Sequence, residues 1–196
     1  MSPRQRVFRL VALVAYVVAI SATMLLAGHT RAQPSCNPQW QPFDPSTATI
    51  SGADGQVWAA TEWDPDGAGP EGLKIVIGGE FAIAGSVLAN KVAAFDPATG
   101  EWSAFGSGIG GSTSNLENRV IALCAMPDGR LVAAGKFYSA GSQSAASIAV
   151  WNGDEWSALG SGINNTVTCV AAMPNGDIIA GGYFTAAGGI PALNIA

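Results

Sequence analysis

The chain has 196 residues, with nine Lys and Arg, fourteen Asp and Glu and one His, which gives a formal net charge of −5 at pH 7. This acidic balance repels phosphate groups, and no basic run or stripe offsets it. Binding to nucleic acid or to an anionic membrane surface is therefore disfavoured.

The first 32 residues predict a secretory signal peptide. Arg4, Arg6 and Arg9 precede an uncharged, mostly apolar stretch of 19 residues, 10–28, and small residues at 30 and 32 suit a cleavage site. An uncleaved anchor is the alternative, because 19 uncharged residues can just span a bilayer. We expect a secreted or cell-surface protein whose folded part begins at residue 33.

Three cysteines fall in that part, Cys36, Cys124 and Cys169. An odd count leaves at least one of them unpaired within the chain. In the predicted strands Cys124 and Cys169 have the same parity, so both point to the same side of their sheets. This disfavours a bridge between these two cysteines and makes Cys36 the more plausible partner for either.

Short strands and tight turns follow one another through the rest of the chain, and no helical period is sustained there. Val, Ile and aromatic residues alternate with turns that contain Pro, Asn, Asp and Gly, such as Met126-Pro127-Asp128-Gly129 and its copy at 173–176. Strands are predicted at 40–43, 57–63, 73–78, 92–95, 102–105, 120–126, 131–135, 147–151, 155–159, 167–173 and 178–181, with another beginning near Leu193. Residues 139–146 are predicted to form a loop of small residues.

Two phrases recur with periods of about fifty residues, which is typical of propeller blades. One is Gly-Gly-x-Phe, and the other is Trp-Ser-Ala-(Phe/Leu)-Gly-Ser-Gly-Ile. Close packing of neighbouring sheets, or a bulge that needs positive φ, explains the glycines better than a bound ligand. The structural repeat positions are Gly78, Gly79, Phe81, Trp102, Gly135, Phe137, Trp156, Gly181, Gly182 and Phe184.

These repeats predict an all-β fold, a β-propeller of four-stranded antiparallel blades over residues 33–196. Blades are expected at roughly 57–105, 120–159 and 167–196, with 40–43 as an N-terminal outer strand. Three blades are fewer than the usual four to eight. We expect a fragment of a longer propeller, and the alternative is a homodimer that assembles six blades.

The pattern resembles a kelch motif. Gly78 and Gly79 end the second strand, Phe95 precedes the turn that begins at Asp96, and Trp102 opens the fourth strand. The next copy has Ala134, Gly135, Trp151, Asn152 and Trp156 in these places. The Gly-Gly-x-Phe pattern is also similar to repeats in large secreted bacterial propeller proteins. The resemblance covers roughly residues 40–196 and implies a fold rather than a ligand.

Catalytic groups are scarce in this sequence. The only histidine, His29, lies in the predicted signal peptide, so Ser-His-Asp and Cys-His relays and zinc sites with imidazole ligands cannot be built from residues 33–196. Copper oxidase activity, which some kelch-like propellers have, needs histidine ligands as well. The segment 64–67, Asp-Pro-Asp-Gly, resembles a calcium loop, but two carboxylates in a turn are too few. We expect no catalytic residue, no cofactor and no metal site in this chain.

We therefore expect a secreted or cell-surface binding or scaffold module that contacts a protein or glycan through its loops. The segments 66–72 and 110–118 differ most between repeats and are the expected contact loops. Trp58, Trp63 and Trp151 lie in predicted strands and are expected in the core. The alternative is the N-terminal part of an extracellular enzyme, carbohydrate-active or oxidase-like, whose catalytic residues lie in further repeats.

Overall fold

The computed structural model describes residues 52–67, 69–110 and 118–196. All of them belong to one structural unit, Phe43–Ala196, and the regular elements described are sixteen β-strands. Among these residues no helix is long and apolar enough to cross a membrane. The predicted signal peptide, Cys36 and the predicted outer strand at 40–43 lie outside the described residues.

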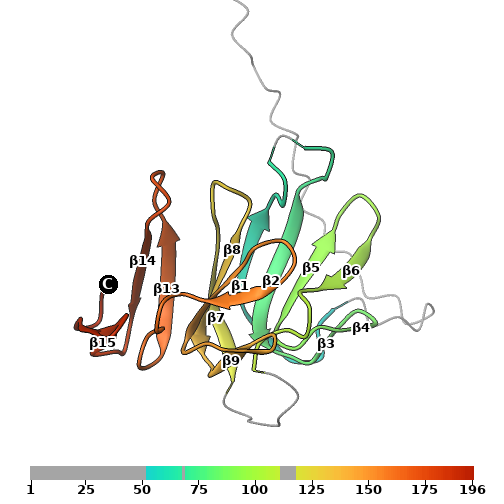
Figure 1. The fold of residues 1–196 in the computed structure, drawn as a ribbon. Coiled ribbons are helices and arrows are strands. Elements are labelled where there is room, and N and C mark those ends of the chain that lie inside the picture. Colours follow the sequence, from blue (N-terminus) through green and yellow to red (C-terminus); the bar gives the residue numbers. More distant parts are fainter. Residues whose placement is uncertain (1–51, 68, 111–117) are drawn as a thin grey trace, which may run out of the picture. The chain divides into compact units, whose positions relative to one another are not determined.

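The strands form three successive antiparallel sheets of similar plan (Figure 1). The first sheet has the order β1-β2-β5-β6 and contains β1 (Gln56–Trp63), β2 (Lys74–Glu80), β5 (Val92–Asp96) and β6 (Glu101–Ala104). The second sheet has the order β7-β8-β11-β12 and contains β7 (Arg119–Ala125), β8 (Leu131–Lys136), β11 (Ile148–Trp151) and β12 (Trp156–Ala158). Chain order and spatial order coincide, so each of these two sheets is a simple meander.

The third sheet begins in the same way. It pairs β13 (Val167–Ala172) with β14 (Ile178–Gly182), and a bridge between Gly181 and Ile195 marks the place of a third strand. Backbone hydrogen bonds between Ala180 and Ala196 continue that pairing. The sheet pairing expected of a strand near Leu193 is therefore present at residues 194–196, as one bridge and hydrogen bonds and not as a full strand.

A short hairpin follows the second strand of every sheet. These hairpins are β3 (Ile83–Ala84) with β4 (Val87–Leu88), β9 (Ser139–Ala140) with β10 (Gln143–Ser144), and β15 (Ala186–Ala187) with β16 (Ile190–Pro191). The prediction of a loop at 139–146 is therefore wrong. Strands of two residues are too short to show alternation in the sequence, which is why the hairpins were missed.

The double glycines mark two different close approaches. The second glycine of each pair, Gly79, Gly135 or Gly182, lies opposite a β-bulge in the neighbouring strand. A Cβ atom at Gly135 would collide with the carbonyl oxygen of Arg119 in that bulge. A Cβ atom at Gly78, the first glycine, would lie 2.5 Å from Cγ1 of Val120 in the next sheet. The bulge thus requires glycine at the second position, and the packing on Val120 requires it at Gly78, whereas the second sheet has the buried Ala134 at that first position. None of these glycines has positive φ.

Apolar residues fill the spaces between successive sheets. One buried cluster joins Trp63 and Val76 of the first sheet to Val120 and Leu131 of the second. Another joins Met126 and other residues of the second sheet to residues of the third. The recurring phenylalanines Phe81, Phe137 and Phe184 are all buried, as expected of core positions.

The tryptophans do not all behave as predicted. Trp156 is buried and its Nε1–H donates a 2.9 Å hydrogen bond to the carbonyl oxygen of Phe105. Trp63 and Trp151 are buried too, but Trp58 is 50% exposed, so its assignment to the core is wrong. Trp58 is the extra residue of the bulge in β1, and this displaces it from the alternation of its strand.

Candidate binding site between the first two sheets

A concave pocket of about 310 Å³ lies where the β1–β2 loop meets the second sheet. Pro65, Asp66 and Glu71 of the loop line one side of it. Ser103 of β6 and Gly153, in the turn between β11 and β12, also line it. Concave sites with an apolar base and a few polar groups are the usual form of small-ligand sites in proteins.

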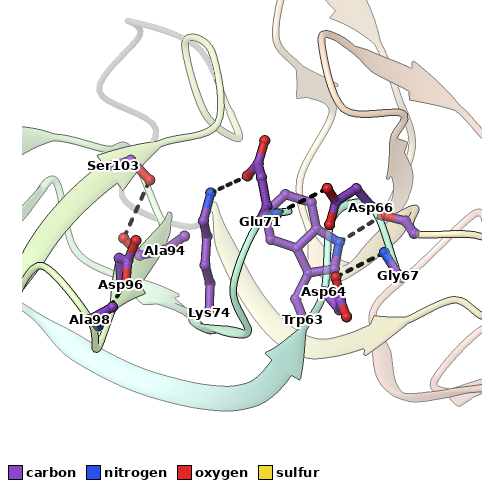
Figure 2. A network of polar contacts seen from close by, with 11 residues as sticks. Trp63, Asp64, Asp66, Gly67, Glu71, Lys74, Ala94, Asp96, Ala98 and Ser103 are labelled. Carbon is purple, nitrogen blue, oxygen red and sulfur yellow. Dashed lines mark hydrogen bonds and ion pairs between the residues drawn. The ribbon is translucent and has the colours of Figure 1, made fainter. Parts of the chain in front are cut away.

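Loop residues hold the loop in shape. Oδ1 of Asp64 accepts a 2.8 Å hydrogen bond from the N–H of Gly67, and Oδ2 of Asp66 accepts a 3.1 Å bond from the N–H of Glu71 (Figure 2). The carbonyl oxygen of Asp66 also accepts a 3.2 Å bond from the N–H of Gly69. The prediction of turn chemistry at 64–67 is confirmed by these bonds. Among the described residues no group of three or more His, Cys, Asp or Glu side chains is placed to hold a metal ion.

One ammonium group lies at the edge of the pocket. Nζ of Lys74 is 2.7 Å from Oε2 of Glu71 and 6.0 Å from the centroid of the Trp63 ring. Figure 2 shows the lysine side chain reaching toward Glu71 at the end of the loop. The Lys74 side chain is 22% exposed and the Glu71 side chain 53% exposed, so water screens this pair and it contributes little to stability. The pair instead sets the polar character of the pocket entrance.

Buried aromatic rings form the base. The Trp63 ring lies 5.2 Å from the Phe105 ring, and the Phe105 ring lies 5.4 Å from the Trp151 ring at an interplanar angle of 88°. All three residues are less than 10% exposed, at 6%, 3% and 7% respectively. A ligand would therefore meet small parts of these rings and not a broad face, so the base shapes the pocket more than it offers stacking.

The β7–β8 turn of the second sheet supports the loop from outside the pocket. Nε1–H of Trp63 donates a 2.7 Å hydrogen bond to the carbonyl oxygen of Gly129. Gly129 has a φ of +84°, and a Cβ atom there would lie 2.5 Å from the carbonyl oxygen of Pro65. Only glycine satisfies both conditions without strain, so this turn and the loop are fitted to one another.

The structure places one of the two predicted contact loops at this pocket, because 66–72 forms one of its sides. Of the other loop, 110–118, only Gly110 and Asn118 lie within the described residues. Asn118 is 3% exposed, and its Nδ2–H donates a 3.4 Å hydrogen bond to the carbonyl oxygen of Gly110. These two residues anchor the base of that loop, and the contact role of the rest stays a prediction.

Among the described residues, Asp54 and Asp128 do not line the pocket. Asp54 accepts hydrogen bonds from the N–H groups of Ala82 and Ile83, and Asp128 pairs with Arg130 at 2.7 Å. Arg130 lowers the pKa of the Asp128 carboxyl chiefly through their side-chain hydrogen bond. Asp54 thus ties the segment before β1 to the start of β3, and Asp128 serves its own turn.

A second pocket of about 270 Å³ lies between the second and third sheets. Its lining is apolar side chains and glycines, including Ile163, Ile178 and Ala180. Because it offers no polar side chain to orient a ligand, the pocket beside Asp66 and Glu71 is the better candidate for recognition.

Comparison with known families bears on the fold alone. Residues 127–149 match a family described as a β-propeller domain of unknown function, DUF5122. The match covers β8, the β9–β10 hairpin and the start of β11. No curated protein matches the chain. With the antiparallel meanders, this match supports the predicted all-β propeller, whose three described sheets are fewer than the four to eight of a usual ring.

Proposed function

We propose that this protein is a secreted or cell-surface propeller module of the kelch-like type, which binds a partner and has no catalytic centre in this chain. The pocket bounded by the β1–β2 loop is its proposed contact site. The observation that carries this proposal is the junction of a hydrogen-bonded loop with a buried aromatic base. Variable loops fixed on a rigid scaffold are common carriers of specificity.

The chemistry of the pocket favours a ligand that donates hydrogen bonds. Asp66 and Glu71 present carboxylates there, and the ammonium of Lys74 is already paired with Glu71. Without residues 1–32 the chain has five basic and fourteen acidic residues, a net charge near −9, which attracts cations and repels anions. Hydroxyl groups of a glycan, or an amino or guanidinium group of a protein partner, suit this setting.

Arrays of glycans and of lysine- and arginine-containing peptides test the proposal, with the labelled protein applied at low ionic strength. The decisive variant is Glu71→Gln, and its matched control is Asp177→Asn, which removes the same charge from an exposed turn of the third sheet. We expect at least one ligand class to bind, with about tenfold weaker binding for Glu71→Gln, equivalent to about 1.4 kcal/mol.

Binding that both variants weaken equally would trace the effect to net charge and contradict the assignment to this pocket. Absence of binding on both arrays would contradict the proposed function itself. Denaturation curves of both variants show whether either substitution has altered the fold.

A further inference from the structure

The inner strand of each sheet, β1, β7 or β13, has two faces that meet different neighbours. Val120 of β7 packs in the core shared with the first sheet, and Met126, directly after β7, packs in the core shared with the third. We call these the leading face and the trailing face. The bulge that the three strands share fixes the correspondence between them, so Val57 and Val167 occupy the place of Val120.

Among the sheets that the structure describes, one leading face and one trailing face carry exposed apolar residues. Val57 is 48% exposed, whereas the equivalent Val120 and Val167 are both 0% exposed. Met173 on the trailing face of β13 is 41% exposed, whereas the equivalent Met126 is 5% exposed. The first and third sheets therefore each expose residues whose equivalents are buried in a contact between two sheets.

We propose that these two faces bind one another between copies of the chain, so that the trailing face of the third sheet receives the leading face of a second copy's first sheet. The apolar side chains match those of the contact already seen. Ile179, 41% exposed on β14, takes the place of Val132, which is buried in the core between the second and third sheets.

The backbone leaves room for this contact. In the first sheet, Gly78 lies so close to the second sheet that a Cβ atom would be 2.5 Å from Cγ1 of Val120. Gly181 holds the place of Gly78 in the third sheet, and Val57 holds the place of Val120 in the first. The proposed contact thus repeats a valine above a glycine, and the Cys169 side chain, whose Sγ lies 2.7 Å from the Cβ position of Gly181, must turn aside to admit it.

Two such contacts would close a pair of copies. The described sheets of such a pair number six, within the four to eight that propeller rings usually contain, and a head-to-tail contact that closes avoids open filaments. One residue opposes the contact: Glu62, on the leading face of β1, stands where the other inner strands have the half-buried Ala125 and Ala172. We therefore expect Glu62→Ala to tighten the pair.

Light scattering after gel filtration measures the mass of the protein over a range of concentrations. We expect twice the chain mass at high concentration, and a dissociation constant that Ile179→Arg raises about tenfold or more. Leu88→Arg is the matched control, because Leu88 is 66% exposed on the β3–β4 hairpin and belongs to no inner strand. A single-copy mass at all concentrations would overturn the proposal, because the exposed faces of the first and third sheets would then not bind one another.

Cross-linking tests the register. Sγ of Cys169 lies 2.7 Å from the position of a Cβ atom at Gly181, so a thiol at position 57 of the second copy should meet it. In a Cys36→Ser, Cys124→Ala background, Val57→Cys should give a disulfide-linked dimer under mild oxidation. Thr61→Cys is the matched control for Val57→Cys. Thr61 lies on the trailing face of β1, at the place that Cys124 holds in β7.

The remaining outcomes of these two experiments also decide. A dimer linked through Cys169 alone, in the background without Val57→Cys, would show contact between two third sheets and overturn the head-to-tail arrangement. Masses that grow beyond two copies would overturn the closed pair. Cross-linking by Val57→Cys with a mass of two copies is the result that supports it.

Discussion

Replacement of Trp63 tests how the first sheet is joined to the second. Trp63 is 6% exposed, donates a 2.7 Å hydrogen bond to Gly129 and has its ring 5.2 Å from that of Phe105. Trp63→Met installs the residue that stands at the equivalent place in the other two inner strands. It loses a hydrogen bond worth about 1 kcal/mol and an aromatic pair worth about 0.5–1.5 kcal/mol, so we expect a cost of about 2 kcal/mol. Trp63→Ala also empties the site and should cost about 3–5 kcal/mol.

Urea denaturation followed by far-ultraviolet circular dichroism measures these costs. The protein concentration must be the same for all variants, because pairing of copies would make stability depend on it. Trp58→Ala is the control, since Trp58 is 50% exposed and its loss should cost only about 0.5 kcal/mol. Equal losses for Trp58→Ala and Trp63→Ala would refute the placement of these two side chains, and with it the described base of the pocket.

Two further predictions concern the backbone and a partly buried charge. Gly135→Ala should destabilise the protein by about 1–3 kcal/mol in the same assay, because its Cβ would collide with the backbone of Arg119. Gly72→Ala is the control: it has open space around it and should stay within about 0.5 kcal/mol of the parent. Similar costs for the two variants would contradict the bulge explanation. Burial lowers the pKa of Lys91 below its ordinary value of 10.5, and the charge of Glu80 acts in the opposite direction. Between the two pKa values the unfolded chain binds more protons than the folded one, so the free energy of unfolding should rise with pH in the window below 10.5. Lys91→Met should remove this contribution to the slope of unfolding free energy against pH. An unchanged slope in that variant would refute the prediction.

Much of the fold follows from local patterns. The turn at 126–129 forms as predicted: the N–H of Gly129 donates a 3.1 Å bond to the carbonyl oxygen of Met126, and the long strands were placed to within two residues at their ends. Local signals failed where the pairing itself is irregular. Trp58 is itself the extra residue of a bulge in β1 and is 50% exposed, whereas Trp63, in the regularly paired part of the same strand, is buried. Alternation in a single sequence does not locate such a bulge.

The pocket was only half predictable, for a similar reason. Its loop departs from the repeat and is visible in the sequence. The base joins Trp63 to Phe105, at the far end of the same repeat, and to Trp151, in the next repeat. Their association depends on how two sheets pack, and only the three-dimensional arrangement shows it.

The comparison between repeats narrows where recognition can reside. Positions such as Phe81, Phe137 and Phe184 keep one residue type and are buried, because each sheet must solve the same packing problem. The connection between the first two strands is five residues long in the second and third sheets but ten in the first, 64–73. At the same point methionine is replaced by Trp63, whose indole bonds the neighbouring turn and so supports the longer loop. The longer loop and its supporting side chain depart from the repeat together and both line the pocket, which supports the contact proposed there.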